Sequence, residues 1–98
     1  MEDLNMDSQD LSIIKVYVKH KNYRSISFYN NKFTEVPKFI WKHKKLEILN
    51  VSANEIEMIS NRIGGLRKLR MLDLGHNKIE QIPNEIGQLK SLDGFLYE

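Results

Sequence analysis

The chain has 98 residues, enough for one domain, and 41% of them are hydrophobic, which allows only a modest core. It contains no cysteine, so disulfide bonds, thiol catalysis and cysteine-based metal sites are excluded. No stretch approaches the roughly 20 apolar residues that a membrane-spanning helix needs. We therefore expect a cytoplasmic, intracellular protein that has no membrane partner.

The net charge of +2 conceals an uneven distribution of charge along the chain. Residues 1–10 carry four acidic side chains and no basic one, so we expect an acidic, disordered tail that is unlike a signal peptide. Residues 11–45 carry nine Lys or Arg against Glu35 alone. This basic segment predicts either attraction for an anionic partner or a solvated outer face, and the solvated face is favoured.

Residues 11–22, with the sequence LSIIKVYVKHKN, are expected to form an N-terminal cap. Ile14, Val16 and Val18 alternate as they would in a strand, although the segment also presents one apolar helix face. Its content of β-branched residues favours the strand.

A constant period organises the rest of the chain. Four sets of residues recur at a spacing of 23: Tyr23, Leu46, Leu69 and Leu92; Ile26, Leu49, Leu72 and Phe95; Phe28, Val51, Leu74 and Tyr97; and Asn31, Asn54 and Asn77. Residues 46–56 (LEILNVSANEI) and 69–79 (LRMLDLGHNKI) resemble the leucine-rich-repeat pattern L-x-x-L-x-L-x-x-N-x-L. The second halves of the units are similar to the 23-residue repeats of intracellular Ras-related scaffolds and of many bacterial repeat proteins.

The resemblance implies an α/β leucine-rich-repeat solenoid, a short right-handed arc with parallel strands on its concave side. We place complete repeats at 23–45, 46–68 and 69–91 and a partial repeat at 92–98. The spacing of three between Ile63, Leu66 and Leu69 predicts a short helical or 3₁₀ turn on the convex side. One unit cannot bury its own apolar face, so stacking of units has to complete the core.

The recurring asparagines predict a structural ladder. An amide side chain both donates and accepts hydrogen bonds, so each one can satisfy backbone groups of its own and of a neighbouring repeat. The family resemblance implies the same role, and we do not interpret these residues as a binding site.

The last residues begin a fourth repeat and stop at its strand. We expect an uncovered edge at Leu92, Phe95 and Tyr97. Three interpretations fit this edge: the chain is a fragment of a longer array, another copy pairs with the edge, or the end frays. The first two are favoured.

Catalytic and metal-binding interpretations find little support in the sequence. His20 and His43 lie one repeat period apart, but two histidines without a third ligand make a weak metal site. No spacing joins a nucleophile to a base, and the segment WKHKK, residues 41–45, fits a solvated convex surface better than a nucleic-acid contact. We therefore expect no enzyme activity, no catalytic residue, no cofactor and no metal, and we consider nucleic acid an unfavoured partner.

The leading hypothesis is a protein-interaction module that binds a protein or peptide through its concave strands, the recognition face that the resemblance implies. The candidate contact residues are Tyr29, Ile48, Asn50, Met71, Asp73 and His76. Ile48 and Met71 share one repeat position, so they predict adjacent exposed apolar side chains. The alternatives are a structural repeat unit that is truncated or self-assembles into a homodimer through its C-terminal edge, and an anion-binding module formed by residues 15–45.

Overall fold

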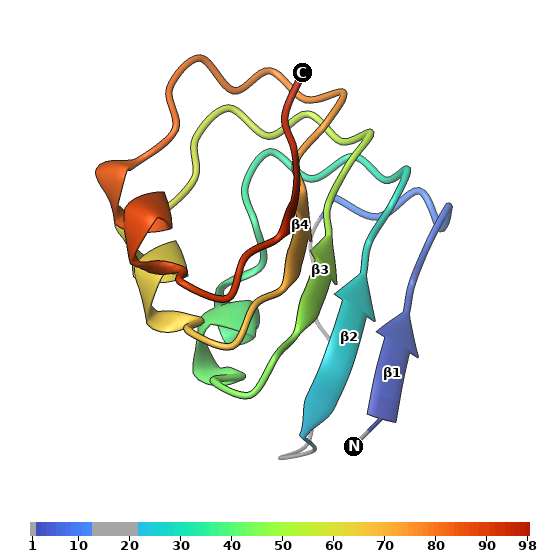
Figure 1. Ribbon diagram of the computed structural model, residues 1–98. Coiled ribbons are helices and arrows are strands. Elements are labelled where there is room, and N and C mark those ends of the chain that lie inside the picture. The colour runs from blue at the N-terminus through green and yellow to red at the C-terminus, as the bar shows by residue number, and fades with distance from the viewer. Residues whose placement is uncertain (1, 13–21) are drawn as a thin grey trace.

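The computed structural model describes residues 2–12 and 22–98. One sheet with parallel pairing contains five strands, and their spatial order is their order in the sequence. The strands are β1 (Glu2–Asn5), β2 (Tyr23–Ser27), β3 (Ile48–Asn50), β4 (Met71–Asp73) and β5 (Gly94–Leu96). Figure 1 shows β1 to β4 side by side along one wall of the molecule.

Short 3₁₀ helices form the opposite wall (Figure 1). They are η1 (Lys38–Lys42), η2 (Asn61–Gly65) and η3 (Asn84–Gln88). Each begins directly after Pro37, Ser60 or Pro83. Proline has no backbone N–H to donate, so it is tolerated at the start of a helix but not in its interior. The sheet, the turns and the repeat period together form a short leucine-rich-repeat solenoid, as expected. None of the described helices has the length and apolar character needed to cross a membrane.

The core lies between the two walls and is built from equivalent positions of successive repeats. Ile26, Leu49 and Leu72 point inward from neighbouring strands and are completely buried. Ile40 and Ile63 close the core from the helical side. Because each repeat covers the apolar face of the one before it, the chain obtains a continuous core from units that could not fold alone.

The predicted asparagine ladder is confirmed. The side-chain amide of Asn54 donates to the carbonyl oxygens of Val51 and Ser52 in its own repeat and of Phe28 in the preceding one. Its side-chain oxygen accepts from the backbone N–H of Phe33, at 3.0 Å. Asn31 and Asn77 repeat this pattern, so the ladder ties each turn to the repeat before it.

The expectation of a disordered tail at residues 1–10 is wrong over the strand β1. From Asp3 onward β1 pairs with β2 in a register that sets Asp3 beside Ser25, and Leu4, Met6 and Leu11 pack against the core. These three occupy the positions of Ile26, Phe28 and Phe33, so residues 1–11 (MEDLNMDSQDL) follow the same pattern with a slightly shorter period of 22. The acidic side chains lie between the apolar positions and leave these free to face the core.

The expected N-terminal cap at residues 11–22 falls mostly outside the described residues, which omit 13–21. At its beginning, Leu11 belongs to the first repeat. Its carbonyl oxygen accepts a hydrogen bond from the N–H of Lys32, at 2.7 Å.

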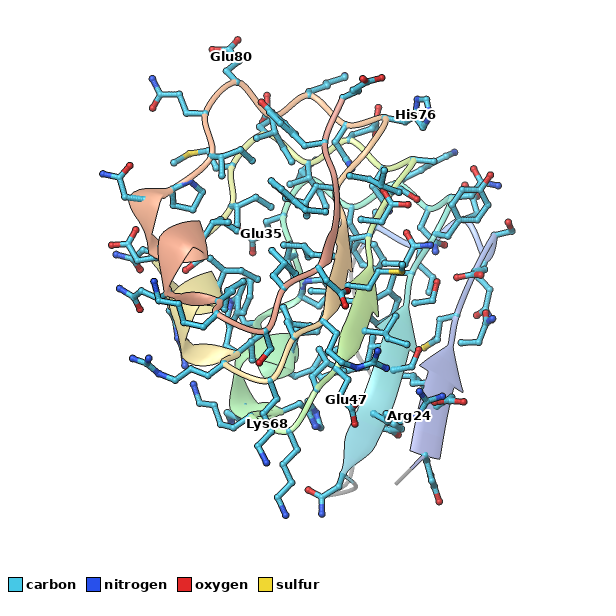
Figure 2. The ribbon with its side chains drawn as sticks, viewed as in Figure 1. Arg24, Glu35, Glu47, Lys68, His76 and Glu80 are labelled. Carbon is cyan, nitrogen blue, oxygen red and sulfur yellow. The ribbon has the colours of Figure 1, made fainter. Side chains whose placement is uncertain are left out.

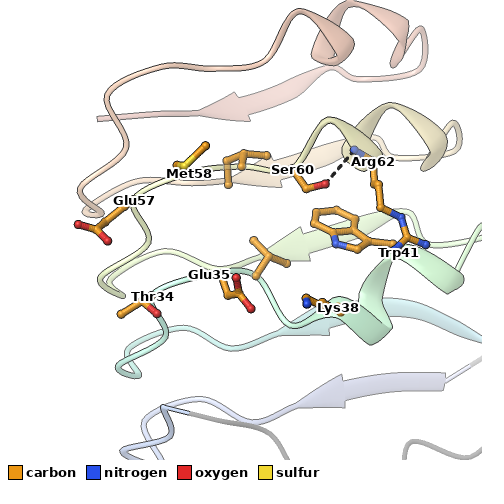
Figure 3. A pocket seen from close by; sticks show the side chains of 10 residues that line it. Thr34, Glu35, Lys38, Trp41, Glu57, Met58, Ser60 and Arg62 are labelled. Atoms are coloured by element: carbon orange, nitrogen blue, oxygen red, sulfur yellow. Dashed lines mark hydrogen bonds between the residues drawn. The ribbon is translucent and has the colours of Figure 1, made fainter.

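The helical wall is packed unevenly because one repeat position holds a glycine in η2 and a tryptophan in η1. A Cβ added to Gly64 would lie 2.6 Å from Oε1 of Gln88 and 3.1 Å from the backbone oxygen of Glu85, so η3 packs directly on η2. Trp41 occupies the equivalent position in η1 and is buried. Its indole ring fills the interval between η1 and the segment that carries Ser60 and Arg62 (Figure 3).

Candidate functional site

The concave face is formed by the side chains that alternate with the core positions along the strands. Strand register aligns Ser25, Ile48, Met71 and Gly94 in one row. It aligns Ser27, Asn50, Asp73 and Leu96 in a second row. At the N-terminal side, Asp3 and Asn5 of β1 extend the two rows by one strand. The face is therefore five strands wide.

The structure places Ile48, Asn50, Met71 and Asp73 of the predicted contact residues on these two rows. Met71 is 44% exposed, whereas Ile48, Asn50 and Asp73 are half-buried. The Met71 side chain leans over Gly94, because a Cβ added there would lie 3.0 Å from the Met71 methyl carbon. Ile48 and Met71 thus form a small apolar surface, and the absence of a side chain at Gly94 leaves room for the Met71 side chain.

Tyr29 and His76 flank the face beyond the ends of the strands. Tyr29 is 44% exposed, and its backbone N–H donates to Asp7 at 2.9 Å. His76 has a left-handed backbone with a φ of 55°, a conformation it shares with Asn30 and Ala53 at the equivalent positions. This turn directs the exposed His76 away from the sheet, as Figure 2 shows.

Polar side chains of the second row stabilise the turns after the strands and are also partly exposed. Oδ1 of Asn50 accepts from the backbone N–H of Ser52 at 2.9 Å, and Oδ1 of Asp73 accepts from the N–H of Gly75 at 3.0 Å. These bonds close the turns after the strands and hold one oxygen of each side chain in place. They leave the Asn50 amide nitrogen and the second Asp73 oxygen as the polar groups offered to a partner.

Ion pairs border the rows at the start of the strands. Arg24 lies 3.4 Å from Asp3, and Nε of Arg70 donates to Oε1 of Glu47 at 3.0 Å. Arg24 and Glu47 lie at this end of the sheet in Figure 2. Because each pair joins two neighbouring repeats, the border is a row of charges of alternating sign beside the apolar surface.

Two parts of the face were missed by the sequence interpretation. Asp3 and Asn5 were missed because β1 was assigned to a tail. Leu96 was missed because the partial repeat was interpreted only as an edge, although Leu96 aligns with Asp73 and is 56% exposed. The period itself contained both signals, since a shift of 22 aligns Asn5 with Ser27 and a shift of 23 aligns Asp73 with Leu96.

The residues of the predicted C-terminal edge have different surroundings. Leu92 is half-buried against the core, whereas Phe95 and Tyr97 are exposed. The rings of Phe95 and Tyr97 stack with their centroids 6.5 Å apart, and the Tyr97 hydroxyl donates to the Ile79 carbonyl oxygen at 2.8 Å. Self-association through this edge stays a prediction.

Two hollows lie on the lateral surface, between the strands and the helical wall. The larger has a volume of about 420 Å³ and separates residues 34–38 from 57–62, with Trp41 in its lining (Figure 3). The second, of about 330 Å³, lies between residues 57–59 and 80–83. Both are lined by Glu57, Met58 and Ile59, and Met58 is 76% exposed. Residues of this lateral surface therefore serve as control positions in tests of the concave face.

The histidine hypothesis can be followed for His43, since His20 lies outside the described residues. The His43 ring makes edge contacts with Tyr23, at a centroid distance of 5.3 Å, and with Phe39, at 5.8 Å. Among residues 2–12 and 22–98, no group of three or more metal-ligating side chains lies close enough to hold an ion. The contacts give His43 a packing role beside the helical wall.

Comparison with known proteins agrees with the repeat geometry. The leucine rich repeat family profile matches residues 21–79 and, in a second register, residues 44–94. No curated protein matches the chain at a significant level. The two profile matches together cover residues 21–94, which is most of the chain and runs from β2 to the start of β5, so the chain belongs to the leucine-rich-repeat family.

Proposed function

We propose that this chain recognises a protein partner through its concave strand face. Leucine-rich-repeat domains generally mediate protein–protein interaction, and the family is typically non-enzymatic. The observation that carries the proposal is the apolar surface of Ile48 and Met71, which lies between a charged border and a hydrogen-bonded polar row. An apolar centre with a polar rim is the usual composition of a protein-recognition surface.

The charge of the concave face supports a partner of basic character. Five strand segments, 2–7, 23–29, 46–52, 69–75 and 92–98, carry seven carboxylates, two arginines and no lysine. Within the part of the chain that the structure describes, Asp73, Asp93 and Glu98 make no ion pair. A segment that combines a bulky apolar side chain with Lys or Arg would place the apolar group on Met71 and its cations against these carboxylates.

The size of the face supports weak binding. Five strands about 4.8 Å apart span about 19 Å, and a strand of three or four residues adds about 10–13 Å. The resulting area of about 200–250 Å² is well below the roughly 800 Å² that each partner contributes to a standard interface. We therefore propose a short peptide segment as the occupant of this face.

Selection of peptides from a random displayed library, followed by titration of synthetic peptides, tests the proposal. The selected peptides should combine one large apolar residue with Lys or Arg. Replacing Ile48 and Met71 by serine should weaken their binding at least about tenfold, because the apolar anchor is removed. Met58→Ser is the matched control, since Met58 is an exposed methionine on the lateral surface.

A second pair of variants tests the charge of the face. Asp73→Asn keeps the turn, because Asn50 makes the same bond at the equivalent position. Asp73→Asn combined with Asp93→Asn should therefore weaken basic peptides, whereas Glu57→Gln with Glu80→Gln should not. Two results would rule out the concave site. In the first, the selected peptides bind the Ile48 and Met71 serine double variant as tightly as the unaltered chain. In the second, their affinity falls only with Met58→Ser.

A second candidate function is self-assembly through the C-terminal edge, and the exposure of Phe95 and Leu96 on β5 and of Tyr97 after it favours this candidate. Light scattering after size exclusion, over a range of concentrations, measures it directly. Self-assembly predicts a molar mass that rises with concentration from the monomer value of 11.6 kDa and returns to that value in the variant Phe95→Lys. A mass that stays at the monomer value at every concentration would eliminate this candidate.

A further inference from the structure

Among the described residues, every Lys or Arg side chain that makes no ion pair lies on the helical wall. The segments 37–45, 60–68 and 83–91, which contain the three 3₁₀ helices and the turns after them, hold eight Lys or Arg and one acidic residue, Glu85. All eight cations are exposed, and none makes an ion pair with a described residue.

The remaining cations of the described chain behave in the opposite way. Arg24 lies on β2, Arg70 directly precedes β4, and Lys32 and Lys78 lie in the loops after these strands; each of the four has a carboxylate within 4.0 Å. Asp10, through a hydrogen bond and its charge, raises the pKa of Lys32. The chain thus supplies a carboxylate to every described cation outside the helical wall and to none within it.

Six of the eight cations, here called the basic band, lie at the end of a 3₁₀ helix or in the turns that lead from the helices to the next strands. Its residues are Lys42, Lys44, Lys45, Arg67, Lys68 and Lys90. Lys44, Arg67 and Lys90 share one repeat position, and Lys45 and Lys68 share the next, so the band crosses three stacked repeats. The ammonium of Lys44 reaches the following repeat, since a Cβ on Gly65 would lie 2.7 Å from it.

Stabilisation of helix ends accounts for only part of the band. Cations near a helix C-terminus interact favourably with its free carbonyl groups, but the effect is confined to the last turn. Of the six residues only Lys42 lies in the last turn of a helix. Lys44, Lys45, Arg67, Lys68 and Lys90 follow the helices, where a carboxylate partner would stabilise the fold equally well.

We propose that the basic band is a docking surface for an acidic polypeptide segment, separate from the concave site. Single-stranded nucleic acid needs exposed aromatic side chains for base stacking, but Trp41 is 3% exposed and Phe39 is half-buried. A five-residue 3₁₀ helix is too short to read a duplex groove as a recognition helix does.

Carboxylates at the border between the basic band and the strands favour an acidic peptide over a uniformly anionic surface as the partner. Glu47 follows Lys45 by two residues, and Asp93 follows Lys90 by three, at the start of β3 and β5. A membrane or a phosphodiester backbone would bring negative charge close to both of them. A polypeptide can place each Asp or Glu against a lysine and leave the positions opposite Glu47 and Asp93 uncharged.

Fluorescence anisotropy with a labelled peptide in which serines separate the glutamates, here called oligo-glutamate, tests the proposal on the whole chain. The peptide should bind, and its affinity should fall as salt is raised from about 50 mM to about 200 mM, because exposed charges are screened. Lys44→Glu combined with Lys68→Glu should weaken binding at least about tenfold through like-charge repulsion. Lys32→Glu with Lys78→Glu produces the same net charge outside the band and should change the affinity less than about twofold.

Three results would overturn the proposal. They are the absence of oligo-glutamate binding at low salt, equal losses in the two charge variants, and tighter binding to duplex DNA or to phosphatidylserine vesicles measured in parallel. The serine double variant of Ile48 and Met71 should bind oligo-glutamate normally, so failure of the concave site and failure of the basic band are distinguishable.

Discussion

The two walls of this small solenoid are built from the same repeats but use charge in opposite ways. Along the strands, Arg24 and Arg70 are each fixed by a carboxylate of a neighbouring repeat. Along the helical wall, Lys68 and its neighbours have no such partner, and Figure 2 places Lys68 and the acidic Glu80 far apart on the molecule. A net charge of +2 therefore says little about what either surface attracts, because the partner responds to the local field.

Both walls depend on the asparagine ladder, so its removal should have the largest effect on stability. Asn54→Ala leaves the N–H of Phe33 and three carbonyl oxygens without this partner. Unfolding in urea, followed by circular dichroism, should show a loss of about 1–3 kcal/mol. Asn77→Ala should cost less, because Asn77 is half-buried and water can replace part of its bonds. An Asn54→Ala protein of unchanged stability would refute the structural role of the ladder.

Most of the fold could be predicted from the sequence because the repeat pattern records burial directly. A residue such as Leu49 is apolar because it faces the core, so its recurrence at Leu72 reveals the stacking. The first strand escaped because its period is 22 and its acidic composition is typical of a tail. The predicted positions of Ile48 and Met71 on one row are confirmed for the same periodic reason.

The pairing of charges could not be predicted in this way. Glu47 and Arg70 lie one repeat period apart, and so do Lys45 and Lys68, yet the first two form an ion pair and the second two are both cations without a carboxylate partner. The sequence gives the spacing of such residues, but the reach and direction of long side chains follow from the packed structure. The basic segment at residues 11–45 was accordingly recognised only in part, since the basic band continues to Lys90.

Alanine should disrupt the close packing of the helical wall at Gly64 but not at Gly87, the equivalent position of the next repeat. Gly64→Ala would push a methyl group against the backbone oxygen of Glu85 as well as the flexible Gln88 side chain. A loss of about 1–3 kcal/mol is expected for such overpacking. Gly87→Ala is the control, since nothing lies within 4 Å of the added Cβ. Thermal unfolding of both variants measures the contrast, and equal melting temperatures would show that η2 and η3 can separate at little cost.

The stability of the chain can be raised at a turn that follows one of the strands. Ala53 has a φ of 55°, a left-handed conformation that asparagine tolerates better than alanine and that Asn30 adopts at the equivalent position. Ala53→Asn should therefore stabilise the chain by about 0.5–1 kcal/mol, within the range of other relieved backbone conflicts. Urea denaturation measures the change, and a destabilised variant would mean that the half-buried Ala53 side chain has packing that asparagine disrupts.

The smallest expected effect compares two nearby arginines, one with a carboxylate partner and one without. Arg70 is paired with Glu47 across the strands, whereas Arg67 belongs to the unpaired basic band. Arg70→Gln should cost about 0.2–1 kcal/mol, the usual value of an exposed ion pair, and the cost should shrink as salt rises. Arg67→Gln should leave stability unchanged or raise it slightly, because it removes repulsion among neighbouring cations. If Arg67→Gln were the more destabilising of the two, the band would serve the fold, and its availability for an acidic partner would lose its support.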